Sequence, residues 1–183
     1  EDTGQKQATC RVDPALSGVG GSLGDMGTHE HNLACFVSGL SVRELAADLS
    51  RFVPGRKLDD NAHLLLRFEN DARGMLWCSQ VAPGNENGLK LRVYGDKGGL
   101  EWQQEHPNQL RFASTGKPPQ VLSRGGPSLG KAAPLATRIP AGHPEGYLEA
   151  FANLYKDLTE QIRARRGKRK PDPASLLVPT VEH

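Results

Sequence analysis

Alternating apolar and polar residues between positions 42 and 93 constrain the fold of this 183-residue chain more than any other feature. The alternating runs recur about every ten residues and are separated by the turn-rich segments PGRKLDD, ENDARG and APGNENG. Their apolar positions are Leu45, Ala47, Leu49 and Val53, then Ala62, Leu64, Leu66 and Phe68, then Met75, Trp77 and Val81, and finally Leu89, Leu91 and Val93. This pattern predicts an antiparallel meander with one buried face.

The segments after the meander predict more strands and a late helix. GDKGG at 95–99 predicts a tight turn into LEWQQE, and QLRFAS and PQVLSR predict further short strands. Residues 125–143 are rich in Gly, Pro, Ala and Ser, which indicates a long loop with room for one short helix. A helix is predicted from Pro144 to about Arg166, with a buried stripe of Tyr147, Phe151, Leu154, Leu158 and Ile162.

These elements predict an α+β fold in one domain. An open, mainly antiparallel sheet carries helices packed on one face and leaves the other face, near Trp77 or Trp102, for a partner. A net charge of +2 gives no general attraction to nucleic acid or to anionic membranes. No apolar run approaches the roughly 18 residues of a membrane span. Cys10, Cys35 and Cys78 have no CxxC spacing, which is typical of small buried thiols in a reducing cytoplasm.

The basic run RARRGKRK, residues 163–170, is the one segment that resembles a nucleic-acid-binding tail. It lacks interleaved aromatic residues and lies at the end of the predicted helix, where cations favour the helix dipole and face solvent. We therefore expect no nucleic-acid partner.

The stretch GGSLGDMGTHEHNLACFVSG predicts a helix that starts near Asp25 or Thr28 and ends at Gly39. Asp25 and His29 share one face of this helix, whereas His29 and His31 point about 200° apart. Three interpretations remain open at this point. They are a metal site with a remote third ligand, an acid/base pair, and a polar surface on which Asp25 only caps the helix. The spacing disfavours the metal, and His31 is expected to face solvent.

The glycines of this stretch, at positions 18, 20, 21 and 24, let a backbone or a ligand approach closely. They do not form a dinucleotide fingerprint, because no apolar strand precedes them.

The same stretch resembles the GG-x-x-x-D-x-G-x-H motif of the glucose–fructose oxidoreductase, inositol dehydrogenase and rhizopine-catabolism family (Gfo/Idh/MocA). The order of motif helix, meander, VYGDKGGLEW turn and AGHPEGYLEAFANLY helix also resembles that family's C-terminal domain. The resemblance implies a dihydrodipicolinate-reductase-like C-terminal domain over residues 1–183. It further implies a homo-oligomer formed through the open sheet face, and NAD or NADP bound by an N-terminal Rossmann domain.

The resemblance also assigns roles to single residues. It implies that His29 exchanges the hydroxyl proton of a sugar, polyol or inositol-like substrate, and that Asp25 binds the adjacent hydroxyl and fixes His29. Asn32 stands where some inositol dehydrogenases carry an acid, and its amide can donate and accept hydrogen bonds. His143 is a further candidate for substrate binding. No metal is expected.

The resemblance implies that this chain is the substrate-binding and oligomerisation part of a longer cytoplasmic dehydrogenase. Without the Rossmann domain and its lysine, the fragment alone is expected to be inactive. The alternative is a non-catalytic regulator or scaffold built on the same domain. The choice between NAD and NADP would lie wholly in the other domain.

Overall fold

The computed structural model describes residues 12–127, 129–130 and 132–179, so Cys10 lies outside the described residues. The chain divides into two compact units, residues 1–87 and 88–183. Every strand pair in both units is antiparallel, and the described part of the chain is α+β as predicted. The single sheet expected from the sequence is instead two sheets, β1-β2-β3 and β4-β5-β6-β7.

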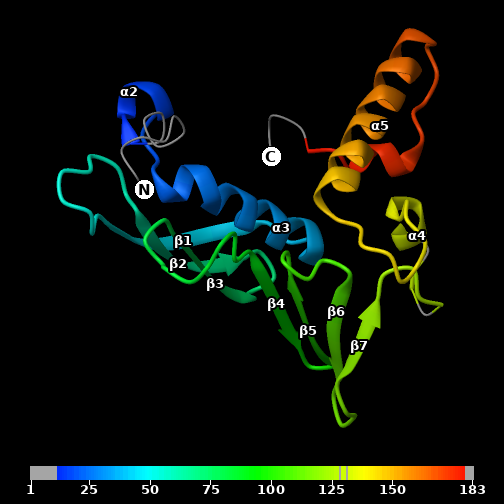
Figure 1. The fold of residues 1–183 in the computed structure, drawn as a ribbon, viewed down its shortest axis with the longest axis horizontal. Coiled ribbons are helices and arrows are strands. Elements are labelled where there is room, and N and C mark those ends of the chain that lie inside the picture. Colours follow the sequence, from blue (N-terminus) through cyan, green and yellow to red (C-terminus); the bar gives the residue numbers. More distant parts are fainter. Residues whose placement is uncertain (1–11, 128, 131, 180–183) are drawn as a thin grey trace. The chain divides into compact units, whose positions relative to one another are not determined.

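The first unit places a helical segment on one face of a three-stranded sheet (Figure 1). Its elements are the short helix α2 (Pro14–Ser17), the π-helix η1 (Leu23–Gly27), the helix α3 (Thr28–Ser38) and the strands β1 (Val42–Ser50), β2 (Asn61–Phe68) and β3 (Arg73–Ser79). Gly39 ends α3 in the left-handed conformation that the sequence predicts, with φ +68°.

The core of this unit is the face of β2 that the alternating pattern predicts. Ala62, Leu64, Leu66 and Phe68 are buried, together with Leu76 and Cys78 of β3. Leu23, Met26 and Cys35 of the helical segment pack against this cluster. Removing these side chains from water is the main force that holds the helices on the sheet.

The predicted facing of β3 is wrong. The alternating pattern predicts Met75 and Trp77 in the buried face, but they are 76% and 55% exposed. The pairing explains this, because Trp77 lies opposite His63 and Leu76 lies opposite Leu64. Since side chains alternate between the two faces of a strand, a prediction that is off by one residue assigns every side chain of β3 to the wrong face.

The outer part of β1 also differs from the prediction. Leu45 and Leu49 pair with Leu66 and Ala62 and so share the core face, yet both are exposed. The helical segment contacts β2 and β3 and leaves this edge of the sheet uncovered.

The opposite face of this sheet carries an aromatic and apolar patch. His63 and Trp77 stack with nearly parallel rings, 6.0 Å between centroids, and Trp77 Nε1 donates to Asn61 Oδ1 at 2.9 Å. Leu65 and Met75 pair beside them and are exposed. We name the exposed side chains His63, Leu65, Met75 and Trp77 the open-face patch.

The second unit contains the predicted later strands and helices. Its elements are β4 (Lys90–Gly95), β5 (Gly98–Gln103), β6 (Gln109–Ser114), β7 (Gln120–Ser123), α4 (Ala132–Ala136), α5 (Tyr147–Arg166) and the 3-10 helix η2 (Pro173–Leu177). The 95–99 turn and the short helix within the 125–143 loop are confirmed. None of the described helices combines the length and apolar character that crossing a bilayer requires.

Two details of the late helix correct the prediction. It begins at Tyr147 rather than Pro144, because Gly146 is its N-cap and donates its N–H to Glu149 at 2.9 Å. The predicted buried stripe is largely exposed, and only Ala164 of this helix is buried. Periodicity identifies which residues share a face, but it does not show what covers that face.

We expect the chain to self-associate through the open-face patch, because a contiguous apolar sheet face in water favours burial against a partner. Leu65→Glu should shift the sedimentation profile of the full-length protein toward monomer. Leu16→Glu, which changes an exposed leucine on α2, should leave the profile unchanged. A strictly monomeric wild type at high concentration would contradict this expectation.

Candidate functional site

The motif segment begins its helix earlier than the sequence predicts. The α-helix α3 begins at Thr28, one of the two predicted starts, but the π-helix η1 begins at Leu23 and runs directly into it. Asp25 lies inside the π-turn, with its N–H bonded to the carbonyl of Gly21 at 3.0 Å. The interpretation of Asp25 as a helix cap is therefore wrong. Single π-turns are rare in proteins, and those that occur are often found at functional sites.

The residue that satisfies the start of this helix is Asp59, from the loop between β1 and β2. Its carboxylate accepts hydrogen bonds from Gly21 N–H at 2.7 Å, Ser22 Oγ–H at 2.7 Å and Leu23 N–H at 2.8 Å. These are the donors that a helix leaves unpaired at its N-terminus. Asp59 thus joins the motif segment to the sheet from a position about 37 residues away.

The ionisation of Asp59 reflects this arrangement. Burial alone would raise the pKa of its carboxyl, but the hydrogen bonds from Leu23, Ser22 and Gly21 outweigh burial and hold the pKa below its ordinary value. The carboxylate form is therefore the one that the fold requires.

Two glycines of the motif are explained by close approach. A Cβ on Gly21 would lie 1.9 Å from the carbonyl oxygen of Asp59, so no other residue fits there without moving the backbone. A Cβ on Gly27 would lie 2.6 Å from Cδ1 of Leu23 and 3.4 Å from Sγ of Cys78 on β3. Of the four glycines expected to permit close approach, Gly21 confirms it, with the loop between β1 and β2 as its partner. Gly18 and Gly24 instead have open space around them.

Asp25 lines a polar cleft of about 340 Å³ within the first unit. Its walls are the π-turn and the segment that follows β3: Asp25, Met26, Ser79, Gln80, Val81, Ala82, Pro83, Asn85, Glu86 and Asn87. The sequence indicates only a solvated turn at 85–87. The structure places this turn in the same cleft as Asp25, a long-range proximity that no local pattern encodes.

The other predicted residues of the motif lie outside the lining of this cleft. His29 and Asn32 are exposed on α3, and His29 is one turn beyond Asp25. The sequence predicts that His31 faces solvent, but it is half-buried, with its Nε2 3.5 Å from Sγ of Cys35. The structure therefore leaves His29 more accessible than His31.

Glu30 is a polar group on the core side of α3. It is half-buried, its Oε2 has no hydrogen-bond partner among the described residues, and burial raises the pKa of its carboxyl to about 7. Burial, together with the nearby Glu30 charge, raises the pKa of the Cys78 thiol to about 11. Cys78 is therefore an unreactive core thiol at neutral pH.

The sequence raises two alternatives to an acid/base site, a metal site in the motif helix and a nucleic-acid-binding tail at residues 163–170. Among the described residues, no three His, Cys, Asp or Glu side chains gather in a way that could hold a metal ion. The basic run bends back on its own helix, since Arg169 pairs with both carboxylate oxygens of Glu160 at 2.6 and 2.8 Å. That pairing lowers the pKa of Glu160 to about 2.

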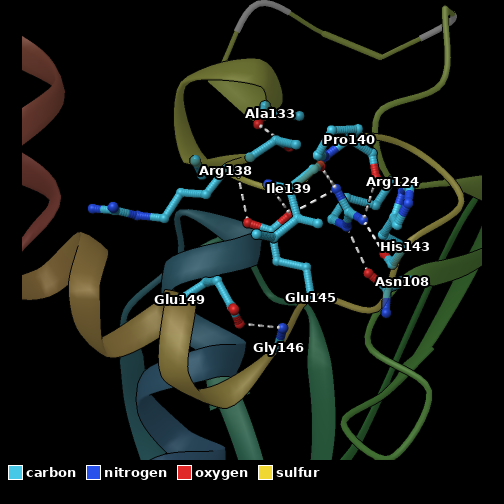
Figure 2. Close-up of polar contacts among 12 residues, drawn as sticks. Asn108, Arg124, Ala133, Arg138, Ile139, Pro140, His143, Glu145, Gly146 and Glu149 are labelled. Atoms are coloured by element: carbon cyan, nitrogen blue, oxygen red, sulfur yellow. Dashed lines mark hydrogen bonds and ion pairs between the residues drawn. The ribbon is translucent and has the colours of Figure 1, made fainter.

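His143 lies in the second unit, on a loop held by a buried ion pair (Figure 2). Arg124 Nη1 is 2.6 Å from the Glu145 carboxylate, and its Nη2 donates to the backbone carbonyl of His143 at 2.6 Å. Glu145 also accepts from the N–H groups of Arg138 and Ile139. The backbone of His143 is thereby fixed while its side chain remains exposed.

Comparison with known proteins gives consistent relatives. The family model of the GFO/IDH/MocA C-terminal domain matches residues 1–101. An uncharacterised oxidoreductase of Bacillus subtilis strain 168, YfiI, is 34% identical over 186 residues, which cover 99% of this chain and 47% of that protein.

Solved structures of similar proteins share the fold. An oxidoreductase from Sinorhizobium meliloti is 56% identical with a TM-score of 0.83, covering 88% of this chain and 45% of that one. An inositol dehydrogenase homologue from Azotobacter vinelandii in complex with NAD+ is 42% identical with a TM-score of 0.85, covering 95% and 48%. An inositol dehydrogenase homologue from Azotobacter vinelandii in complex with NADH and myo-inositol is 38% identical with a TM-score of 0.82, covering 94% of this chain and 47% of that one. The chain spans about half the length of these relatives.

Replacing Asp59 should destabilise the fold. Asp59→Ala removes three hydrogen bonds, two of them from backbone N–H groups, and we expect a loss of about 1–3 kcal/mol at pH 7. Because the folded pKa is lowered, the stabilisation is present above the unfolded pKa of about 3.9 and disappears as pH falls through the folded value. Urea unfolding of the wild type and Asp59→Ala at pH 7 and pH 3 measures this difference, with Asp48→Ala on β1 as an exposed control. If the difference in free energy of unfolding between wild type and Asp59→Ala is as large at pH 3 as at pH 7, the stabilising role of the Asp59 carboxylate is contradicted.

Replacing Glu30 should have the opposite pH dependence. The folded pKa is raised to about 7, so stability is greatest below the unfolded value of 4.5 and declines as pH rises between the two. Glu30→Gln should therefore be more stable than wild type by about 1–2 kcal/mol at pH 8, a figure reduced for partial exposure, and similar to it at pH 4. Thermal melts at the two pH values measure this, with exposed Glu69→Gln as the control. If Glu30→Gln changes the melting temperature equally at pH 4 and pH 8, burial of the Glu30 carboxylate is not the cause of the change in stability.

Proposed function

Because the chain belongs to the Gfo/Idh/MocA family of oxidoreductases, as its C-terminal domain, we propose that it binds the substrate in an NAD(P)-dependent dehydrogenase. The proposed substrate is a sugar, polyol or inositol-like molecule, and the proposed setting is a cytoplasmic homo-oligomer. The observation that carries the proposal is the position of Asp25 in a cleft lined by carboxylate and amide side chains. Such groups recognise hydroxyls, which both donate and accept hydrogen bonds.

The chain's own residues have distinct tasks in this proposal. Asp25 accepts a hydrogen bond from one hydroxyl of the substrate. His29 takes the proton from the hydroxyl that is oxidised, or returns it in the reverse direction, as histidine does in general acid–base catalysis near neutral pH. Its exposure on the turn after Asp25 leaves the imidazole accessible to substrate. Asn32 and His143 are proposed as further hydrogen-bonding contacts.

The nicotinamide, when bound, supplies the hydride acceptor or donor. The glycine-rich stretch does not fit the pyrophosphate of an NAD or NADP molecule, because the Asp59 carboxylate already accepts hydrogen bonds from the N–H groups of Gly21 and Leu23. A second anion there would face like charge. We therefore propose that another domain of the parent protein binds NAD or NADP, and we derive no step at this stretch.

The relatives support the substrate class. The Azotobacter vinelandii inositol dehydrogenase homologue that is 38% identical to this chain was crystallised with NADH and myo-inositol. Its likeness to this chain extends over 94% of the residues.

His29→Ala in the full-length protein should lower kcat by about 10²–10⁴-fold, the usual range for a lost general acid/base. His31→Ala should retain most activity, because His31 is half-buried against Cys35 and is not the more accessible histidine. Steady-state assays of the two variants side by side, with NAD or NADP and a panel of polyols, make the test. Equal activities of His29→Ala and His31→Ala would contradict the assignment of His29 as the acid/base. Loss of activity on adding a chelator would favour the metal site.

A further inference from the structure

We propose that Gln80 is a ligand-binding residue whose side-chain amide donates a hydrogen bond to an oxygen of a neutral, polyhydroxylated molecule in the Asp25 cleft. The inference rests on the proposed function and deepens it, because it names a specificity residue and restricts the substrate class. Gln80 follows β3 directly and lines the cleft together with Asp25.

The orientation of the Gln80 amide is fixed by its neighbour. Arg56 Nη1 donates to Gln80 Oε1 at 3.1 Å. A guanidinium has donors only, so it selects the oxygen end of the amide and excludes the flipped orientation. The backbone N–H of Gln80 also donates to the carbonyl of Asp60 at 2.8 Å.

Arg56 is itself held in place. Its side chain is only 10% exposed and lies 3.9 Å from the carboxylate of Asp60, which is fully buried. That carboxylate also accepts from the N–H groups of Phe52 and Val53 at 2.8 and 2.9 Å. A side chain oriented through two buried, bonded neighbours is pre-organised for binding.

The nitrogen end of the same amide is not paired by the described part of the chain. Gln80 Nε2 is buried and has no hydrogen-bond partner among the described residues. Leaving a buried donor unpaired costs free energy, so a fold that fixes one end of an amide and leaves the other unpaired needs a reason. An oxygen atom of a ligand in the cleft would satisfy this nitrogen.

The charge of the cleft selects the kind of ligand. Its lining includes two carboxylates, Asp25 and Glu86, and no lysine or arginine among the described residues. A phosphorylated or carboxylated sugar would meet like charge from Asp25 and Glu86, and the described lining offers it no lysine or arginine. A neutral polyol, in contrast, can donate to the carboxylates and accept from Gln80.

The wall of the cleft that follows Gln80 in the sequence is built from turns. Residues 82–87 form no helix or strand, and Gly84 and Gly88 have φ of +89° and +67°. Because Nε2 is buried, binding requires this wall to shift so that a ligand oxygen reaches the nitrogen.

The test uses the full-length protein and equilibrium binding in the presence of NADH, so that no turnover occurs. The probe is myo-inositol, with a myo-inositol monophosphate as the charged comparison. Gln80→Leu removes the donor, whereas Gln80→Glu keeps an oxygen for Arg56, removes the N–H groups and adds a negative charge. Gln109→Leu, an exposed glutamine on β6, is the matched control.

Wild type and Gln109→Leu should bind myo-inositol equally, and both Gln80 variants should bind it about tenfold or more weakly while melting within a few degrees of wild type. The monophosphate should bind wild type poorly. If wild type binds myo-inositol and the Gln80 variants bind it as well, the inference about Gln80 fails and the proposed function stands.

Other results are equally decisive. If wild type binds neither myo-inositol nor other neutral polyols, the proposed function fails and the inference fails with it. If both Gln80 variants lose the folded state together with binding, Gln80 is a structural residue and the inference is overturned. Tight binding of the monophosphate would overturn the restriction to neutral ligands.

Discussion

The carboxylate of Asp59 holds the start of the motif helix, and the remaining geometry of the candidate site depends on that contact. It satisfies the N–H groups of Gly21 and Leu23, which would otherwise be unpaired at the helix terminus. It also ties the start of the helix to the loop between β1 and β2. The π-turn that carries Asp25 follows directly, so the position of Asp25 relative to β3 is set from the β1–β2 loop.

The same contact changes the meaning of the glycine-rich stretch. In phosphate-binding loops, glycines let a ligand approach backbone N–H groups at a helix N-terminus. In this chain an aspartate of the protein occupies that position, and Gly21 is required because the Asp59 backbone lies against it. Helix N-termini attract an anion whatever its source, so a glycine-rich sequence identifies an anion-binding backbone and leaves open whether the anion is a ligand or a side chain.

Local pattern predicted the parts of the fold that local physics determines. The buried alternation of Ala62 to Phe68 and the glycine stop at Gly39 follow from side-chain period and backbone freedom. The facing of Met75 and Trp77 depends on pairing register, and the exposure of the α5 stripe depends on what covers it. Asp59 and Gln80 act through contacts 24 to 38 residues away, and only their polar character at strand ends could have drawn attention to them.

Two adjacent aspartates connect both walls of the cleft to one loop. Asp59 faces the motif helix and so positions Asp25, whereas Asp60 binds Arg56 and, through it, orients the amide of Gln80. The N–H of Gln80 also bonds to the carbonyl of Asp60. The two carboxylates bond to different segments of the chain, so one dipeptide serves both walls. A shift of this loop would therefore move the acceptor and the donor of the cleft together, and the spacing between Asp25 and Gln80 is a property of the scaffold rather than of either side chain.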